Sequence, residues 1–368
     1  MNKKTITTMT ISREQSSAMR GIAILGIVLH NYLHWLRPMV KENEYHFSQH
    51  NADRMVFELV SPNIDTWANM ISFFGHYGVP VFVFLSAYGL VMKYEKSLTR
   101  NSPWSFFSSH YRKLFFMMIV GYSAFLLIDN ITPGARHYTF WNVIGQLGMF
   151  SNLYENPDRA IWPGPYWYFG LMVQIYLVYR LFFYKGEKSM WNIIPRKWEN
   201  GVLISVAAFF LLLQLLIPPM SEALEWYRYN IFGSLPVFLL SVLFARKVSA
   251  ARAPWKISKP THLAVTIISC VLTIYFSTMF VTWIFVPFLI CIGTYCFVKC
   301  LPEVLLKGFS WVGTISAAMF VCHPITRKII IPISHRGDIL TGTLIYLITT
   351  IMLSILFKHL IEAVMKQK

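Results

Sequence analysis

The first apolar segment of the chain reads MRGIAILGIVLHNYLHW, from Met19 to Trp35. If this segment is a helix that rises about 1.5 Å per residue, His30 lies about 15 Å beyond Arg20, near the middle of a hydrocarbon core of about 30 Å. Ionisable side chains at that depth are costly, and they usually face a cavity or a partner. The segment therefore predicts a membrane helix that carries a functional site inside a helix bundle.

The composition is typical of a multi-pass membrane protein. Of the 368 residues, 55% are hydrophobic and 14% are charged, whereas soluble proteins carry about 25% charged residues. Apolar runs that are long enough to span a membrane recur from end to end. They cover residues 19–36, 67–92, 112–129, 165–184, 201–217, 231–245, 262–279, 283–298, 309–326 and 339–357.

We therefore predict an all-α fold, a polytopic bundle of about ten transmembrane helices. We expect it to form a single integral-membrane domain over residues 1–368, with no appended soluble domain. Residues 140–153 are also apolar, but this stretch is short and contains glycine. We predict that it is re-entrant or interfacial and does not span the membrane.

The basic residues are distributed as the positive-inside rule requires. With a cytoplasmic N-terminus and alternating sides, 23 of the 33 lysines and arginines fall in inside segments and nine in outside segments, and Arg180 lies within a span. Both termini are therefore predicted to be cytoplasmic, in the inner (cytoplasmic) membrane of the cell, with the first helix retained and not cleaved as a signal peptide. Because topology accounts for most of the net charge of +16, nucleic-acid binding is not predicted.

The cysteines give no sign of a disulfide or a metal site. All five lie in or at the ends of apolar segments and lack the paired Cys/His spacing of a zinc site: Cys270, Cys291, Cys296, Cys300 and Cys322. We expect neither a metal ion nor a bound cofactor.

The first segment places its polar residues on one broad stripe. At about 100° per residue, Asn31 lies about 20° from Arg20, His34 about 40° in the opposite sense, and His30 about 80°. His30 and His34 are also i,i+4 neighbours on a helix. This pattern predicts a reactive group that faces a cavity. The alternative is that Arg20 anchors the helix at the membrane surface while His30 bonds a neighbouring helix.

Two further regions contain candidate residues. Glycine and proline within residues 75–80 are expected to break or kink the second apolar segment. Along that segment, His76 is predicted near the outer face, Ser86 deeper and Tyr88 nearer the cytoplasm. The longest outer polar loop, residues 37–66, could meet a polar acceptor or simply be solvated. Its candidates are Glu42, Glu44, His46, His50, Asp53 and Asp65.

Several motifs follow one another along the chain: an opening Arg-Gly-Ile-Ala…His helix, a Phe-x-Gly-x-x-Gly-Val…Phe-Leu-Ser segment and a late Gly-x-Ile-Ser…His-Pro motif. The stretches concerned are Arg20–His30, Phe74–Leu90, Tyr111–Leu114, Pro165–Tyr176, Trp311–Ser316 and Cys322–Ile325, with a chain end after Glu362. In this order they resemble the membrane-bound acyltransferase 3 family, and the resemblance covers nearly the whole length of the chain.

Three positions depart from the family pattern. Family members commonly have ten residues between the first arginine and histidine, whereas nine separate Arg20 from His30. This difference leaves His34 as a competing active group. Ala87 replaces the usual glycine after the serine, and only Arg112 and Lys113 stand where the family often has two arginines.

The resemblance implies an O-acyltransferase that moves an acyl group, most commonly acetyl, from cytoplasmic acyl-CoA to a hydroxyl of a cell-surface or exported carbohydrate. A thioester is already activated, so the reaction chiefly needs a base, an oxyanion donor and exclusion of water. Our hypothesis is that His30 is the general base, with His34 as the competing base and an acyl-imidazole intermediate as the alternative mechanism.

The same hypothesis assigns the remaining candidates to substrate binding. Arg20 would hold the CoA phosphates, with Arg112 and Lys113 as helpers. The candidates for positioning or oxyanion contacts are Asn31, Ser86 and Tyr88.

The expected partners are acyl-CoA, a carbohydrate or lipid-linked glycan acceptor, the lipid bilayer and glycan-assembly proteins. Two rival functions are consistent with the same residues. A transporter or flippase of glycan precursors could use an intramembrane His/Arg relay, and a non-catalytic scaffold in a glycan-assembly complex would tolerate loss of His30.

Overall fold

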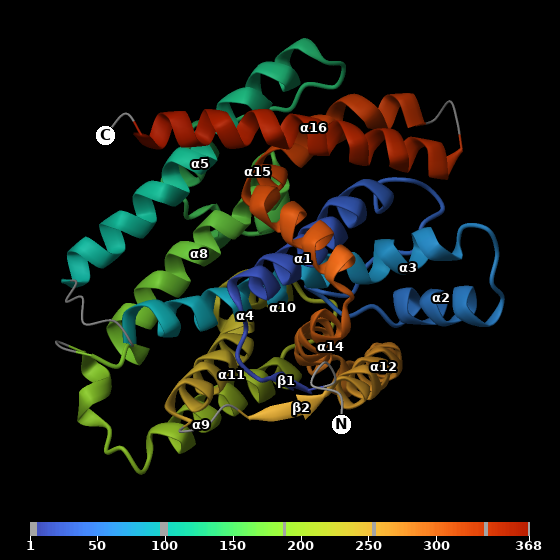
Figure 1. The fold of residues 1–368 in the computed structure, drawn as a ribbon. Helices are drawn as coiled ribbons and strands as arrows, with labels where there is room; N and C mark the ends of the chain where they lie inside the picture. Colours follow the sequence, from blue (N-terminus) through green and yellow to red (C-terminus); the bar gives the residue numbers. More distant parts are fainter. Residues whose placement is uncertain (1–5, 96–101, 187–188, 252–254, 335–337, 367–368) are drawn as a thin grey trace.

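The computed structural model describes residues 6–95, 102–186, 189–251, 255–334 and 338–366. In this part of the chain almost all regular structure is helical, and the long helices pack together (Figure 1). The α-helices are α1 (Arg13–Leu33), α2 (Gln49–Val60), α3 (Thr66–Phe74), α4 (Gly78–Leu90), α5 (Pro103–Ile131), α6 (Phe140–Leu147), α7 (Pro157–Ala160), α8 (Trp167–Val178), α9 (Glu199–Leu213), α10 (Glu222–Tyr229), α11 (Ile231–Ala250), α12 (Lys259–Phe276), α13 (Phe280–Trp283), α14 (Val286–Cys300), α15 (Glu303–Ser334) and α16 (Ile339–Lys366).

Short turns and two strands complete the described structure. The 3₁₀ turns are Gly75–Tyr77, Ser151–Leu153, Gly164–Tyr166, Met190–Ile193 and Gln214–Leu216, and the π-helical turns are Val91–Glu95 and Tyr179–Phe183. Strand β1 (Ile6–Thr8) pairs antiparallel with β2 (Lys256–Ser258), with Ile6 opposite Ser258. This pairing holds β1 beside the start of α12.

Seven helical segments of the described chain are long and apolar enough to cross a membrane: Thr66–Glu95, Pro103–Ile131, Glu199–Leu216, Ile231–Ala250, Lys259–Phe276, Glu303–Pro332 and Ile339–Lys366. The predicted helical fold is therefore confirmed, and these seven segments are consistent with the predicted multi-pass membrane bundle. Each apolar run predicted to span overlaps a helix, but α1, α8 and α14 are not among the seven. Their crossing of the membrane stays a prediction. Helix α6 has 8 residues, which is too short to span.

The backbone of helix α1 approaches the backbone of two neighbouring segments closely. On one side, a Cβ atom added to Gly21 would lie 2.0 Å from the carbonyl oxygen of Phe309, and one added to Gly313 would lie 1.8 Å from that of Ser17. The Ser17 hydroxyl also donates to the Ser310 carbonyl at 2.8 Å. Helices α1 and α15 consequently pack with no side chain between them at this point (Figure 1).

On its other side, α1 meets the break that the sequence predicted. The Gly75–Tyr77 turn interrupts the second apolar segment between α3 and α4. A Cβ atom on Gly75 would lie 2.4 Å from the Gly26 carbonyl oxygen, and one on Gly78 would lie 2.4 Å from that of Ala23. The glycines that break the segment are therefore the residues that let it approach α1.

A single added methyl group tests this packing. Gly313→Ala is expected to lower the free energy of unfolding by about 1–3 kcal/mol or more, because its Cβ atom would overlap backbone, which cannot rotate away as a side chain can. The thermal unfolding midpoint of the purified protein in detergent measures the effect.

Gly308→Ala is the matched control on the same helix, because a Cβ atom there meets nothing within 4 Å. Equal unfolding midpoints for the two variants would contradict the close approach of α1 and α15.

Candidate active site

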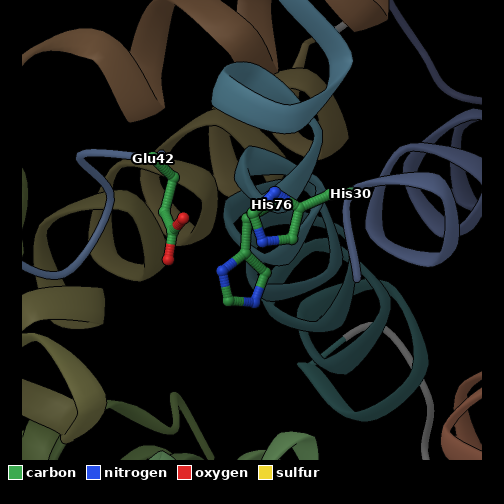
Figure 2. A group of neighbouring side chains, drawn as sticks. All are labelled: His30, Glu42 and His76. Carbon is green, nitrogen blue, oxygen red and sulfur yellow. The ribbon is translucent and has the colours of Figure 1, made fainter. Parts of the chain in front are cut away.

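Three histidines from two segments gather at the end of α1. The rings of His30 and His76 stack with centroids 4.6 Å apart and planes inclined by 9°, and the His34 ring lies 5.2 Å from that of His30. His34 follows the last residue of α1, while His76 belongs to the Gly75–Tyr77 turn. We call His30, His34 and His76 the histidine cluster. Figure 2 shows two of its members, His30 and His76, together with Glu42.

The orientation of His30 is fixed by one hydrogen bond. Its Nδ1 atom lies 2.7 Å from the carbonyl oxygen of Ser72 on α3. Because a carbonyl can only accept, Nδ1 carries a hydrogen, so in the neutral imidazole, the form that burial favours, the lone pair is on Nε2. The side chain is buried, with 3% of its surface exposed. His30 is therefore held as a neutral imidazole with a defined basic nitrogen.

The loop after α1 brings two carboxyl groups to the histidine cluster. Glu42 Oε2 lies 2.6 Å from Nδ1 of His34, and Glu44 Oε2 lies 3.5 Å from Nδ1 of His76. The loop is anchored on α3 near Val40, whose N–H donates to the side chain of Asn69 at 2.9 Å. Its carbonyl accepts from the Ser72 hydroxyl at 2.6 Å. The outer loop, for which a purely solvated role was one expectation, thus contributes Glu42 and Glu44 to the histidine cluster.

The pKa values of the two carboxyl groups are shifted in opposite directions. Burial by itself raises the pKa of Glu42, but the imidazoles, with His34 first among them, outweigh burial and hold this pKa well below its usual range. Burial raises the pKa of Glu44 well above its usual range, since the charge of Arg228 offsets only part of it. Burial and charge therefore favour the ionised form of Glu42 and the protonated form of Glu44. Such a difference between the pKa values of two neighbouring acids is typical of catalytic sites.

The geometry favours proton exchange over metal binding. His30, Glu42 and His76 offer ligand atoms that lie within 4.8 Å of one another, close enough to hold a metal ion (Figure 2). An imidazole, however, binds a metal through a lone pair in the plane of its ring. Because the planes of His30 and His76 are nearly parallel, an ion in the plane of one ring lies outside the plane of the other.

A cavity of about 260 Å³ runs along α1 from Arg20 to Ile27, one helical turn before His30. Its lining is mostly apolar and comes from α1, α4, α5, α8 and α15; we call it the Arg20 cavity. Val79 separates it from a smaller space of about 20 Å³ beside Glu44. The polar residues of its lining are Arg20, Ser86, Tyr168, Tyr176 and Ser316.

The structure brings some predicted site residues together and leaves others apart. His30 and His34 meet in the histidine cluster, and Arg20 and Ser86 line the Arg20 cavity. Asn31 turns toward α15 instead, where its Oδ1 accepts from Arg327 at 3.1 Å.

The remaining predicted residues lie outside the Arg20 cavity. The Tyr88 hydroxyl accepts from the backbone N–H of Ile11 at 3.1 Å. Arg112 and Lys113 have exposed side chains on α5, although the next residue, Leu114, lines the cavity.

Sequence reasoning did not assign His76, Glu42, Tyr168 or Tyr176 to the site. His76 could have been found, because it is an ionisable residue inside a Gly/Pro-broken apolar segment. Glu42 was one acid among several in a polar loop, and no local pattern distinguishes it. The two tyrosines lie in a segment that resembles a family motif, but only tertiary packing places them opposite Arg20.

Comparison with known proteins identifies a family. A family model described as an acyltransferase domain matches residues 15–359. No match was found among curated proteins, and none among solved structures. The matched region contains the histidine cluster, the loop that carries Glu42 and Glu44, and all residues that line the Arg20 cavity.

Asp158 on α7 supplies a test of the electrostatics near this site. Burial, followed by the charge of Glu225, raises the pKa of Asp158 to about 6. A raised pKa means that the folded protein binds this proton more tightly than the unfolded chain does. The resulting stability is fully present below the ordinary pKa, near 4, and is lost as the pH rises through about 6.

Asp158→Asn is therefore expected to raise the thermal unfolding midpoint at pH 8 and to change it little at pH 4. Asn cannot ionise, so the variant avoids the buried charge only where the wild-type residue carries one. Unfolding in detergent at pH 4, 6 and 8 measures the difference. Asp53→Asn, at an exposed position on α2, is the control. A difference for Asp158→Asn that does not vary with pH would contradict the raised pKa.

Proposed function

This chain belongs to the membrane-bound acyltransferase 3 family, whose domain model it matches over residues 15–359, and we propose that it transfers an acyl group from acyl-CoA to a carbohydrate hydroxyl. It is a multi-pass membrane acyltransferase. The donor, the acceptor and the roles of individual residues are the proposal. The observation that carries it is the position of His30, a base of fixed tautomer one helical turn beyond an apolar cavity.

We place the protein in the inner (cytoplasmic) membrane as a single domain of about ten spanning helices with both termini in the cytoplasm. Two contacts support a cytoplasmic position for the N-terminal segment. Strand β1 pairs with β2, in a loop flanked by the basic residues Arg246, Lys247 and Lys259. Lys299 donates to the Thr8 carbonyl at 2.8 Å. These basic segments belong on the cytoplasmic side by the positive-inside rule.

The Arg20 cavity is the proposed donor site. Its apolar lining suits an acyl group and the pantetheine arm, while Arg20 supplies a guanidinium for phosphate. Ser86 is proposed to position the thioester from the cavity wall. Arg112 and Lys113 are proposed to assist phosphate binding from the exposed face of α5, beside the cavity residue Leu114. No bound cofactor is needed for this reaction.

The proposed reaction is a direct transfer. The Nε2 atom of His30 takes the proton of the acceptor hydroxyl as its oxygen attacks the thioester carbonyl carbon. The tetrahedral intermediate collapses, the carbon–sulfur bond breaks, and the thiolate of CoA takes the proton from the imidazolium. The products are the acyl ester and free CoA. Burial of the site limits the competing attack by water.

His34 and Glu42 are proposed to assist this step. Their contact at 2.6 Å resembles the His–carboxylate pairs that orient a catalytic imidazole and stabilise its charged form. The charge of Glu42 therefore stabilises a proton held within the histidine cluster. His34 is also the competing base, because the same carboxylate activates it directly.

Replacement of His30 tests the base. His30→Gln is expected to lower kcat by two to four decades, because the amide can still donate to the Ser72 carbonyl but cannot take a proton. The measurement is thiol release from acyl-CoA by the purified protein with an acceptor. His34→Gln is expected to lose less, and the reverse order would make His34 the base.

The matched control is His50→Ala, at an exposed position on α2. Thiol release at the wild-type rate in both His30→Gln and His34→Gln would refute the mechanism. Absence of thiol release by the wild-type protein would favour the rival transporter or scaffold functions.

Replacement of Arg20 tests the donor site. Arg20→Gln is expected to raise the KM for acyl-CoA about tenfold or more, because a charged hydrogen bond to phosphate is lost. The KM for acyl-pantetheine, which has no phosphate, is expected to change less than twofold.

Arg13→Gln is the control on the same helix, where the side chain is exposed and does not line the cavity. Equal losses with both donors would mean that Arg20 acts on the fold and not on phosphate.

A further inference from the structure

A second cavity lies at the opposite end of α1 from Arg20. It has a volume of about 340 Å³ and is bounded by the segment after α1, the end of α5, the segment before α8, and α15. We call it the Trp35 cavity. Its principal side chains are Trp35, Trp162, Arg136, Arg327 and Lys328. In the proposed topology this end of α1 faces the outside, where an exported carbohydrate would arrive.

The cavity combines aromatic rings with cations. The rings of Trp35 and Trp162 lie 5.7 Å apart and meet at 64°. The guanidinium of Arg136 lies 3.9 Å from the centre of the Trp162 ring, and that of Arg327 lies 5.0 Å from the Trp35 ring. Aromatic faces offer an apolar surface to the C–H face of a sugar ring, and guanidinium groups offer paired donors to carboxylate or phosphate.

The positive charge of this cavity is only partly neutralised. Lys328 pairs with the buried carboxylate of Asp129 at 2.8 Å. Arg327 is 6% exposed and donates to the backbone oxygen and Oδ1 of Asn31, which are both neutral. The Arg136 guanidinium makes a cation–π contact with the Trp162 ring. Two guanidinium groups in the described structure therefore face the cavity without a carboxylate partner.

The Trp35 cavity lies beside the proposed base. Asn31, which holds Arg327, follows His30 directly, and on a helix these neighbours point about 100° apart. Trp35 likewise follows His34 directly. A ligand in contact with Trp35 and Arg327 thus lies at the level of the histidine cluster, beside the end of α1.

The geometry points to an acceptor site that selects an anionic carbohydrate. A carboxylate or phosphate of the acceptor binds Arg136 and Arg327, and its sugar ring packs on Trp35 or Trp162. This inference rests on the proposed function, because it names the acceptor class of the same reaction. It assigns recognition to Arg136, which is exposed and makes no contact with the histidine cluster.

Direct binding tests the inference independently of catalysis. The purified full-length protein in detergent is titrated, without any donor, with trigalacturonate and with its carboxyl-reduced neutral trisaccharide. Trigalacturonate is expected to bind at least tenfold more tightly, and added salt is expected to reduce that advantage. The same measurements on His30→Gln are expected to agree, so a failure of the proposed transfer reaction would not change this result.

Variants locate the anion site. Arg136→Gln is expected to weaken trigalacturonate binding about tenfold and to leave the neutral trisaccharide within twofold, and Arg136→Lys is expected to recover part of the loss. Arg159→Gln, on the exposed surface of the neighbouring segment, is expected to change neither.

A sugar-free polyprenyl phosphate distinguishes the source of the anion. Competition by this lipid assigns the cavity to the phosphate of a lipid-linked acceptor, whereas its failure to compete assigns it to an acidic sugar. Equal affinity for the charged and neutral trisaccharides, without lipid competition, would overturn the inference. Unchanged binding in Arg136→Gln would do the same.

Discussion

The direct backbone contact of α1 with α15 and with the Gly75–Tyr77 turn is the constraint on which the rest of the site depends. Glycines at both contacts leave no side chain that could act as a spacer, so α1 has one depth and one rotation in the bundle. That rotation turns His30 toward Ser72 and His76, and it turns Asn31 toward Arg327. Exchanging those partners would require a rotation of α1 by about 100°, the angle between consecutive residues of a helix. Helix packing therefore sets the position of the reactive imidazole, and the hydrogen bond to Ser72 sets the orientation of its ring.

Ser72 joins the helix and the outer loop into one unit. Its carbonyl oxygen accepts from His30, and its hydroxyl donates to the carbonyl of Val40, at the start of the loop that carries Glu42 and Glu44. Because one residue of α3 serves both, the spacing between the imidazole and the carboxyl groups depends on a short stretch of rigid helix. Rigid elements hold catalytic groups more accurately than free loops do. In the same arrangement, the pKa of Glu42 is lowered and that of Glu44 is raised.

Local patterns predicted the helices and part of the site. Apolar runs, and glycine and proline at residues 75–80, act over a few residues, so the helical segments and the break between α3 and α4 could be predicted. The helical repeat likewise placed His34 beside His30. Glu42 and His76 join the site only through tertiary packing, which one sequence does not specify. Periodicity also does not show which neighbour each face of α1 meets. For this reason the sequence placed Asn31 with Arg20, whereas in the structure Asn31 contacts Arg327.

The anchoring of the outer loop on α3 has a consequence for how relatives of this protein could diverge. In many enzymes a surface loop can be exchanged to alter ligand preference while the reactive groups stay unchanged, since scaffold and loop are separate. Here the loop carries the carboxylate that contacts His34, and Val40 is bonded to the residue that orients His30. A loop exchanged between relatives would bring its own proton-transfer groups with it. Exchange of this loop would therefore change the proton-transfer groups themselves, and not only the surface that meets a ligand.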